Sequence, residues 1–218
     1  MNRTDLAFEA LASRRISHSG NGVNIKKSDI NNLPFTEIKL DKKNAAGKPK
    51  GIYTTLFCTD RDEKTETEAL FRILRDFVPE TGRILAAGLG NANITPDSLG
   101  VRTASRITPT AHFRESQEFA DLGMREVYVV ETGVLAQTGM ESGEQLAFIT
   151  NGVKPALVLV IDSLACAEPD RLGRTIQITD AGIAPGSGVG NTRREVSAKT
   201  LGVPVVAVGV PTANIMRV

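Results

Sequence analysis

Apolar positions along the chain follow two periods, and together they predict alternating strands and helices. The span from Phe35 to Leu40 alternates apolar and polar residues, as a half-buried strand does. A charged turn follows, and Gly51 to Cys58 then predicts a second strand, so the two can form a hairpin. From Asp62 to Val78 the large apolar residues recur at helical spacing. Acidic residues crowd the first turns of this predicted helix, where the helix dipole favours them.

From Arg83 onward the pattern alternates regularly. Helices are predicted up to Arg106 and around 143–151, and strands are predicted at 83–87, 126–130, 156–161, 174–178 and 203–208. This alternation predicts an α/β fold, a three-layer sandwich around a twisted, mostly parallel sheet. We expect one domain over residues 1–218. Residues 1–34 are polar and rich in turn formers, so we expect them to form a mainly irregular arm.

Composition excludes several classes of function. The net charge is only +1, and without a dominant basic stripe we expect no direct contact with nucleic acid. The apolar runs are too short to span a bilayer, and the first residues lack the apolar centre of a signal peptide. Cys58 and Cys166 cannot build a disulfide framework, and His18 and His112 lie among polar residues that suit a surface. We therefore expect a cytoplasmic protein without metal or cofactor.

Three polar segments follow predicted strands, at 88–100, 161–165 and 176–191. Ligands in open α/β sheets bind at the carboxyl ends of strands, so these segments are candidates for a site. The first, GLGNANITPDSLG, lacks the third glycine of a dinucleotide-binding loop and has no Walker lysine. Turn geometry explains its glycines, because glycine tolerates positive φ angles. It does not explain why acidic residues recur at the ends of these predicted strands.

Asp97 and Asp162 are the two acids that this argument selects. Asp97 alone suits a helix N-cap, whereas Asp162 follows an entirely apolar strand and must be solvated, paired or hydrogen-bonded to backbone N–H groups. If their strands are neighbours, the two carboxylates converge on one cleft and share a proton. The ionised member can then activate water while the protonated member donates to a substrate carbonyl, which is the chemistry of an aspartic peptidase.

Several motifs, read together, resemble the germination protease family of spore-forming bacteria. They occur in the family's order over almost the whole chain: RTDLAFEA (3–10), GLGNANITPDSLG (88–100), QTGME (137–141), VIDSLA (160–165), TIQITDAGIAPGSGVGN (175–191) and LGVPVVAVGVPT (201–212). The resemblance implies a fold similar to that of the hydrogenase maturation proteases. It also implies a homotetrameric atypical aspartic endopeptidase that degrades small acid-soluble spore proteins in the forespore or spore core.

The resemblance also implies roles for individual residues. The family's two proposed catalytic aspartates match Asp97 and Asp162. Asp180 lies in another matching motif and is the reserve candidate, with the ordering of the Gly-rich loop as its structural alternative. Asn91 is a supporting candidate in the first loop, and Glu131 stands at another strand end.

The family is made as a zymogen that removes its own N-terminal peptide, cutting after an acidic residue and before an apolar one. In RTDLAFEA this places the cut between Asp5 and Leu6. We therefore expect the segment from Thr4 to Glu9 to mimic a substrate. The alternative is that the five residues before the bond are only a stump, too short to block a site.

The chain also departs from the family pattern. Val101 replaces a usual proline, and Glu131 to Val134 replaces a usual Ala-Pro-Gly-Val, which adds the acid at 131. The chain further resembles a short form that lacks the family's helical C-terminal extension. Two alternatives therefore stay open: a non-catalytic or latent paralogue that binds spore proteins, and a metal-assisted protease of the maturation type with His112 and carboxylates as ligands.

Overall fold

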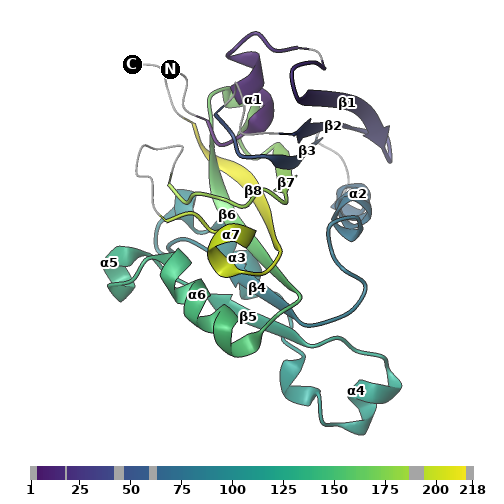
Figure 1. Cartoon of the computed structure of the whole chain (residues 1–218), viewed down its shortest axis with the longest axis vertical. Coiled ribbons are helices and arrows are strands. Elements are labelled where there is room, and N and C mark those ends of the chain that lie inside the picture. The colour runs from purple at the N-terminus through teal and green to yellow at the C-terminus, as the bar shows by residue number, and fades with distance from the viewer. Residues whose placement is uncertain (1–3, 18, 42–46, 59–62, 187–193, 215–218) are drawn as a thin grey trace.

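A single eight-stranded sheet runs through the molecule (Figure 1). The computed structural model describes residues 4–17, 19–41, 47–58, 63–186 and 194–214. His18 and the stretch 187–191 of the Gly-rich segment lie outside these ranges. The strand order is β1-β2-β3-β7-β8-β6-β4-β5.

The sheet has a parallel half and an antiparallel half. The parallel half consists of β4 (Ile84–Gly88), β5 (Val127–Glu131), β6 (Leu157–Cys166) and β8 (Val205–Asn214). The antiparallel half consists of β1 (Val23–Ile30), β2 (Leu33–Leu40), β3 (Gly51–Phe57) and β7 (Thr175–Thr179), and β7 joins β8 in antiparallel pairing. The α/β class is thus confirmed, but the sheet is mixed rather than mostly parallel.

A short connection explains the antiparallel pairing of β1 with β2. Only Asn31 and Asn32 separate β1 from β2, and both have positive φ angles, 50° and 61°. Two residues of this conformation make the tight turn that suits a hairpin. A parallel crossover needs a dozen or more residues, so these neighbours must run in opposite directions.

Helices cover both faces of the sheet, which gives the predicted three layers (Figure 1). Leu146 and Leu201 pack on one face, whereas Ala69 and Ile73 pack on the other. The helices are α1 (Ala7–Ala12), α2 (Glu63–Arg75), α3 (Leu99–Ala104), α4 (Gln117–Asp121), α5 (Leu135–Thr138), α6 (Ser142–Val153) and α7 (Ala198–Leu201), with 3-10 turns at η1 (Thr95–Asp97), η2 (Ala111–Phe113) and η3 (Pro169–Arg171).

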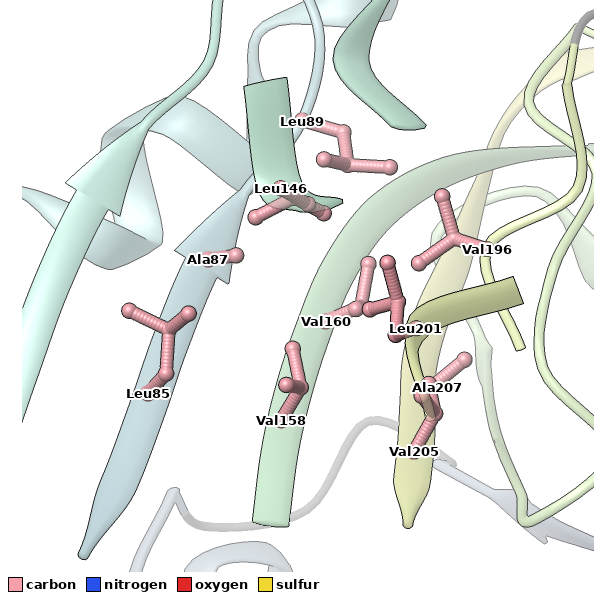
Figure 2. Close-up of a cluster of buried hydrophobic side chains, with 10 residues drawn as sticks. All are labelled: Leu85, Ala87, Leu89, Leu146, Val158, Val160, Val196, Leu201, Val205 and Ala207. Carbon is pink, nitrogen blue, oxygen red and sulfur yellow. The ribbon is translucent and has the colours of Figure 1, made fainter. Parts of the chain in front are cut away.

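The core of the parallel half lies between the sheet and helices α6 and α7 (Figure 2). Val158 and Val160 of β6 point toward these helices, whereas Leu157 and Leu159 belong to the cluster on the opposite face. A strand that buries both faces must be apolar at every position, and this explains the unbroken apolar run that the sequence shows there.

The N-terminal region differs from the expected irregular arm. Within residues 1–34 the structure has helix α1 and strand β1, and Leu6, Ala7 and Leu11 are buried. The burial pattern of β1 does not alternate, because most of its side chains are exposed and the strand depends on its backbone pairing with β2. Hydrophobic periodicity alone could not reveal such a strand. Within the described ranges, no helix combines the length and the apolar composition needed to cross a lipid bilayer.

Candidate active site

The loop after β4 is held against the carboxyl end of β6 by close backbone contacts. Leu89 donates its N–H to the carbonyl of Ile161 at 2.9 Å. Gly100, in the first turn of α3, lies so close to β6 that a Cβ there would come within 2.2 Å of the same carbonyl oxygen. A glycine is therefore required at this position, and the close packing of α3 fixes the turn η1 that precedes it.

Asp97 is the last residue of η1 and is half-buried. Its N–H donates to the carbonyl of Ile94, and its own carbonyl accepts from the N–H of Asn91 at 3.0 Å. The N-cap of α3 is Ser98, so the interpretation of Asp97 as that helix's cap is wrong. Its carboxylate instead lies beside Gly90, at 3.1 Å from where a Cβ would stand.

Asp162 lies within β6, because the strand continues to Cys166 beyond the predicted end at Ile161. The side chain is only 5% exposed. One carboxylate oxygen accepts the N–H of Ser163 at 2.8 Å, as the structural interpretation of this acid expected. This bond does not remove Asp162 from the candidate site, because the residue also lines a pocket.

Asp97 and Asp162 line the same pocket, which has a volume of about 230 Å³. The structure therefore brings together the two acids that the sequence argument selected. A third acid, Asp5, lines the pocket as well, and Pro185 and Gly186 of the Gly-rich segment complete one wall.

Asp180 lies elsewhere. Its side chain is exposed at the end of β7, and its carboxylate accepts the N–H of Ile52 at 2.6 Å, at the start of β3. Because β7 runs antiparallel to β8, its carboxyl end faces the opposite edge of the sheet from that of β6. The structure does not bring the reserve candidate to the pair.

Asn91 and Glu131 differ in their relation to the pocket. The Asn91 amide oxygen accepts from the N–H of Asn93 at 3.0 Å and from Nε2 of Gln137 at 2.9 Å, so it braces the loop against α5. Glu131 ends β5 opposite Gly88, is exposed, and is not among the residues that line the pocket. Asn91 thus supports the loop that carries Asp97, whereas Glu131 stands apart.

His112 is placed in η2, beside a separate pocket along β5. Among the described residues, no group of three or more histidine, cysteine or acidic side chains is arranged to hold a metal ion. The structure therefore does not bring His112 to the two aspartates.

The N-terminal segment runs along the end of β6 and enters the site. Asp5 donates its N–H to the carbonyl of Ala165 at 2.9 Å, and its carboxylate accepts the N–H of Ala165 at 2.9 Å. The carbonyl oxygen of Asp5 accepts from Lys48 Nζ at 2.9 Å and from Gln177 Nε2 at 3.2 Å. Sequence reasoning missed Lys48, which lies in no motif. It also missed Gln177, which lies in the motif at 175–191 but is uncharged and was passed over for Asp180.

Two further residues anchor the segment. Leu6 is 1% exposed and packs against Leu164 and Cys166. The buried carboxylate of Glu9 accepts the N–H groups of Ala167 at 2.7 Å and Glu168 at 3.1 Å, and it also accepts the hydroxyl of Thr4. The residues on both sides of the Asp5–Leu6 bond are therefore held in place.

Comparison with known proteins identifies the family. A family model described as "Peptidase_A25: Germination protease" matches residues 2–216. The chain is 41% identical to the germination protease of Clostridium acetobutylicum over 96% of its own length and 69% of that protein. It is also 41% identical to that of Caldanaerobacter subterraneus (96% and 68% covered) and 37% identical to that of Oceanobacillus iheyensis (96% and 63% covered).

A search of solved structures finds a weaker likeness. The [NiFe] hydrogenase maturation protease HycI from Thermococcus kodakarensis is 20% identical, with a TM-score of 0.43, over 64% of this chain and 80% of that one. The family match and the identities over nearly the full chain are much stronger. The chain therefore belongs to the germination protease family of peptidases.

Proposed function

We propose that the protein is an endopeptidase of spore germination that hydrolyses small acid-soluble spore proteins with Asp97 and Asp162 as its catalytic pair. The observation that carries the proposal is the pocket that half-buried Asp97 and buried Asp162 both line. Family membership supplies the peptidase class, and the names of the relatives supply the setting of germination.

The chemistry follows from two carboxyl groups in one cleft. The proposal assigns one shared proton to the pair, because two carboxylates in one cleft cannot both ionise cheaply. The ionised member takes a proton from water as the water attacks the scissile carbonyl carbon, and the protonated member gives its proton to the leaving amide nitrogen. The burial of Asp162 strengthens these interactions, because the surroundings screen charge less than water does.

The proposal includes self-processing at the Asp5–Leu6 bond. Asp5 lines the same pocket as the two aspartates, and the residues around the bond are anchored to the end of β6. The segment from Thr4 to Glu9 thus occupies the position of a substrate. We further propose a homotetramer in the forespore or spore core, with spore proteins as partners, on the strength of the resemblance.

The test is cleavage of a purified small acid-soluble spore protein, read by mass spectrometry with and without a chelator. We expect Asp97→Asn and Asp162→Asn each to lower the rate by about 10²–10⁴-fold, the usual contribution of general acid–base catalysis. The matched control is Asp180→Asn, which makes the same change at the opposite edge of the sheet and keeps an oxygen to accept the N–H of Ile52.

Three results would contradict the proposal. If Asp180→Asn abolished cleavage and the other two variants did not, the pair would be wrongly assigned. If chelation abolished cleavage, the metal-assisted alternative would hold. If the folded wild-type chain bound the spore protein without cutting it, the protein would be a binding paralogue.

A further inference from the structure

The carbonyl oxygen of Asp5 has two side-chain donors, Lys48 Nζ at 2.9 Å and Gln177 Nε2 at 3.2 Å. This carbonyl belongs to the bond that the proposed function would cut. Hydrolysis of a peptide bond places negative charge on this oxygen in the tetrahedral intermediate. Fixed donors aimed at that oxygen are the usual means by which enzymes stabilise such an intermediate.

We infer that Lys48 and Gln177 form the oxyanion hole for hydrolysis of the Asp5–Leu6 bond, and that they are catalytic residues alongside the aspartate pair. This inference rests on the self-processing in the proposed function. It assigns the stabilisation of the oxyanion to two residues outside that pair.

The sheet register places Gln177 near Asp162. Gly209 of β8 pairs with Asp162 on one side and with Gln177 on the other. Two strand spacings therefore separate the two Cα atoms, a distance of about 10 Å. Side chains two positions apart on a strand share a face, so Asp162 lies on the same face of the sheet as Val160. Ile176 and Ile178, the neighbours of Gln177 on β7, belong to the cluster on the other face. The Gln177 side chain therefore lies on the face that carries Val160 and Asp162. Only Gly209, which has no side chain, stands between Asp162 and Gln177 in this row of the sheet, so it alone separates a peptide held by Gln177 from the Asp162 carboxylate.

Gln177 also fixes the leaving-group side of the bond. Its Oε1 accepts the N–H of Ala7 at 2.7 Å, while its Nε2 donates to the carbonyl of Asp5. One amide group thus brackets Leu6, whose side chain is buried against Leu164 and Cys166. Such a two-point contact orients the carbonyl and holds the bond in a single position for attack.

The Lys48 ammonium adds charge to the hole. It donates to the carbonyl of Thr4 at 3.1 Å as well as to that of Asp5. Burial lowers the pKa of Lys48, and the negative charges of Asp5 and Glu9 oppose this shift. Because only the protonated amine stabilises an oxyanion, self-processing should weaken as the pH rises through this lowered pKa.

The step is balanced as a hydrolysis. Water loses a proton to the ionised carboxylate and bonds to the carbonyl carbon of Asp5, and the carbonyl π electrons move onto the oxygen held by Lys48 and Gln177. The intermediate then collapses, the C–N bond to Leu6 breaks, and the nitrogen takes the proton of the acidic carboxyl group. The products are a carboxylate at Asp5 and a new amino terminus at Leu6.

The experiment follows loss of residues 1–5 by intact mass after the full chain is refolded from urea. The variants are Lys48→Met, which removes one donor, and Gln177→Glu, which keeps the acceptor for Ala7 but removes the other donor. Lys50→Met is the matched control, since Lys50 is exposed two positions away. Circular dichroism melting verifies that each variant folds, and Lys48→Arg tests rescue by a second cation.

We expect Lys48→Met to slow processing by about 10²–10³-fold, as removal of one oxyanion donor does elsewhere. Gln177→Glu should also be slowed by at least about tenfold, and Lys50→Met should match the wild type. Lys48→Arg should restore part of the rate and move the alkaline fall in rate to higher pH, because a guanidinium stays protonated. This pH profile serves as the test if Lys48→Met does not fold.

The failure of this inference differs from the failure of the proposed function. If folded Lys48→Met and Gln177→Glu process at the wild-type rate while Asp162→Asn is inert, the oxyanion hole is overturned and the aspartate pair stands. If the processing rate falls at the same high pH in Lys48→Arg as in the wild type, the role of Lys48 is overturned. If the wild type never loses residues 1–5, both the oxyanion hole and self-processing are overturned. Cleavage of an added spore protein by the wild type then tests the proposed peptidase activity separately.

Discussion

At the scale of single residues, Gly90 determines where Asp97 can lie. Its φ angle is +111°, and a Cβ there would stand 2.0 Å from the carbonyl oxygen of Asp97. We expect Gly90→Ala to displace Asp97 and to lower the rate of peptide hydrolysis by at least about 100-fold, as small displacements of catalytic groups do. Steady-state cleavage of a spore protein measures the effect.

The matched control is Gly123→Ala. Gly123 also has a positive φ angle, +56°, but a Cβ there would meet nothing within 4 Å. Gly123→Ala should therefore lower the free energy of unfolding by about 1–2 kcal/mol, the cost of a left-handed backbone for alanine, and leave the rate unchanged. Equal rates for the two variants would show that the position of Asp97 does not depend on Gly90.

The thiol of Cys58 gives a prediction of pH dependence. Burial, with a smaller contribution from the Glu66 carboxylate, raises the pKa of Cys58 from 9.0 to about 11. The reactive thiolate is therefore about 100-fold scarcer at pH 8 than in a peptide. We expect alkylation by iodoacetamide, mapped by peptide mass spectrometry, to keep rising up to about pH 11. A plateau near pH 9 would contradict this.

The residue scale also shows what sequence could and could not predict. Asp97 and Asp162 were predicted because each follows a predicted strand, and ligands in open α/β sheets bind at the carboxyl ends of strands. Lys48 and Glu9 carried no such signal, and Gln177, although in the segment 176–191, is an uncharged residue that the search for acids passed over. Their roles depend on contacts with the N-terminal segment and the end of β6, which only the tertiary fold creates.

At the scale of elements, α2 is the clearest success of periodicity. The predicted helix over 62–78 is found at Glu63–Arg75, with Ala69 and Ile73 buried on its inner face. We expect Ile73→Ala to lower the free energy of unfolding by about 2–5 kcal/mol, because it opens a cavity beneath the helix. The control is Phe71→Ala, since Phe71 is 65% exposed. Urea denaturation that gave equal losses would contradict this packing.

The direction in which each strand runs could not be predicted from the sequence. An apolar run indicates a strand but not which way it runs beside its neighbour. The strand before Asp180 was expected to join a mostly parallel sheet, yet β7 pairs antiparallel with both β3 and β8. That reversal alone moves Asp180 to the edge opposite Asp162.

At the scale of the whole molecule, the N-terminal region joins the two halves of the sheet. Helix α1 packs on the antiparallel half, in a cluster with Ile38 and Tyr53. Leu6 packs against Leu164 and Cys166 at the end of β6, in the parallel half. The segment is too short and too mixed in polarity for its periodicity to predict this role, so burial could be seen only in the fold.

This arrangement predicts two different results of removing N-terminal residues. A chain that starts at Leu6 keeps α1 and loses the hydrogen bonds of Thr4 and Asp5, so we expect it to stay folded and to lose less free energy of unfolding than a chain that also lacks α1. A chain that starts at Ser13 also loses Leu6, Ala7, Ala10 and Leu11, all buried. Burial of each leucine contributes about 1.5–3 kcal/mol, so this chain should lose about 5 kcal/mol or more.

Urea denaturation of the two shortened chains beside the full chain measures both values. If the chain from Ser13 were as stable as the chain from Leu6, α1 would not belong to the core. The Asp5–Leu6 bond would then not mark the boundary between the removable N-terminal residues and the core. If the chain from Leu6 were itself unfolded, Thr4 and Asp5 would be part of the fold rather than a bound substrate segment. The predicted order, a smaller loss followed by a larger one, means that a cut after Asp5 would remove a residue that lines the pocket and leave the packing of α1 and Leu6 intact.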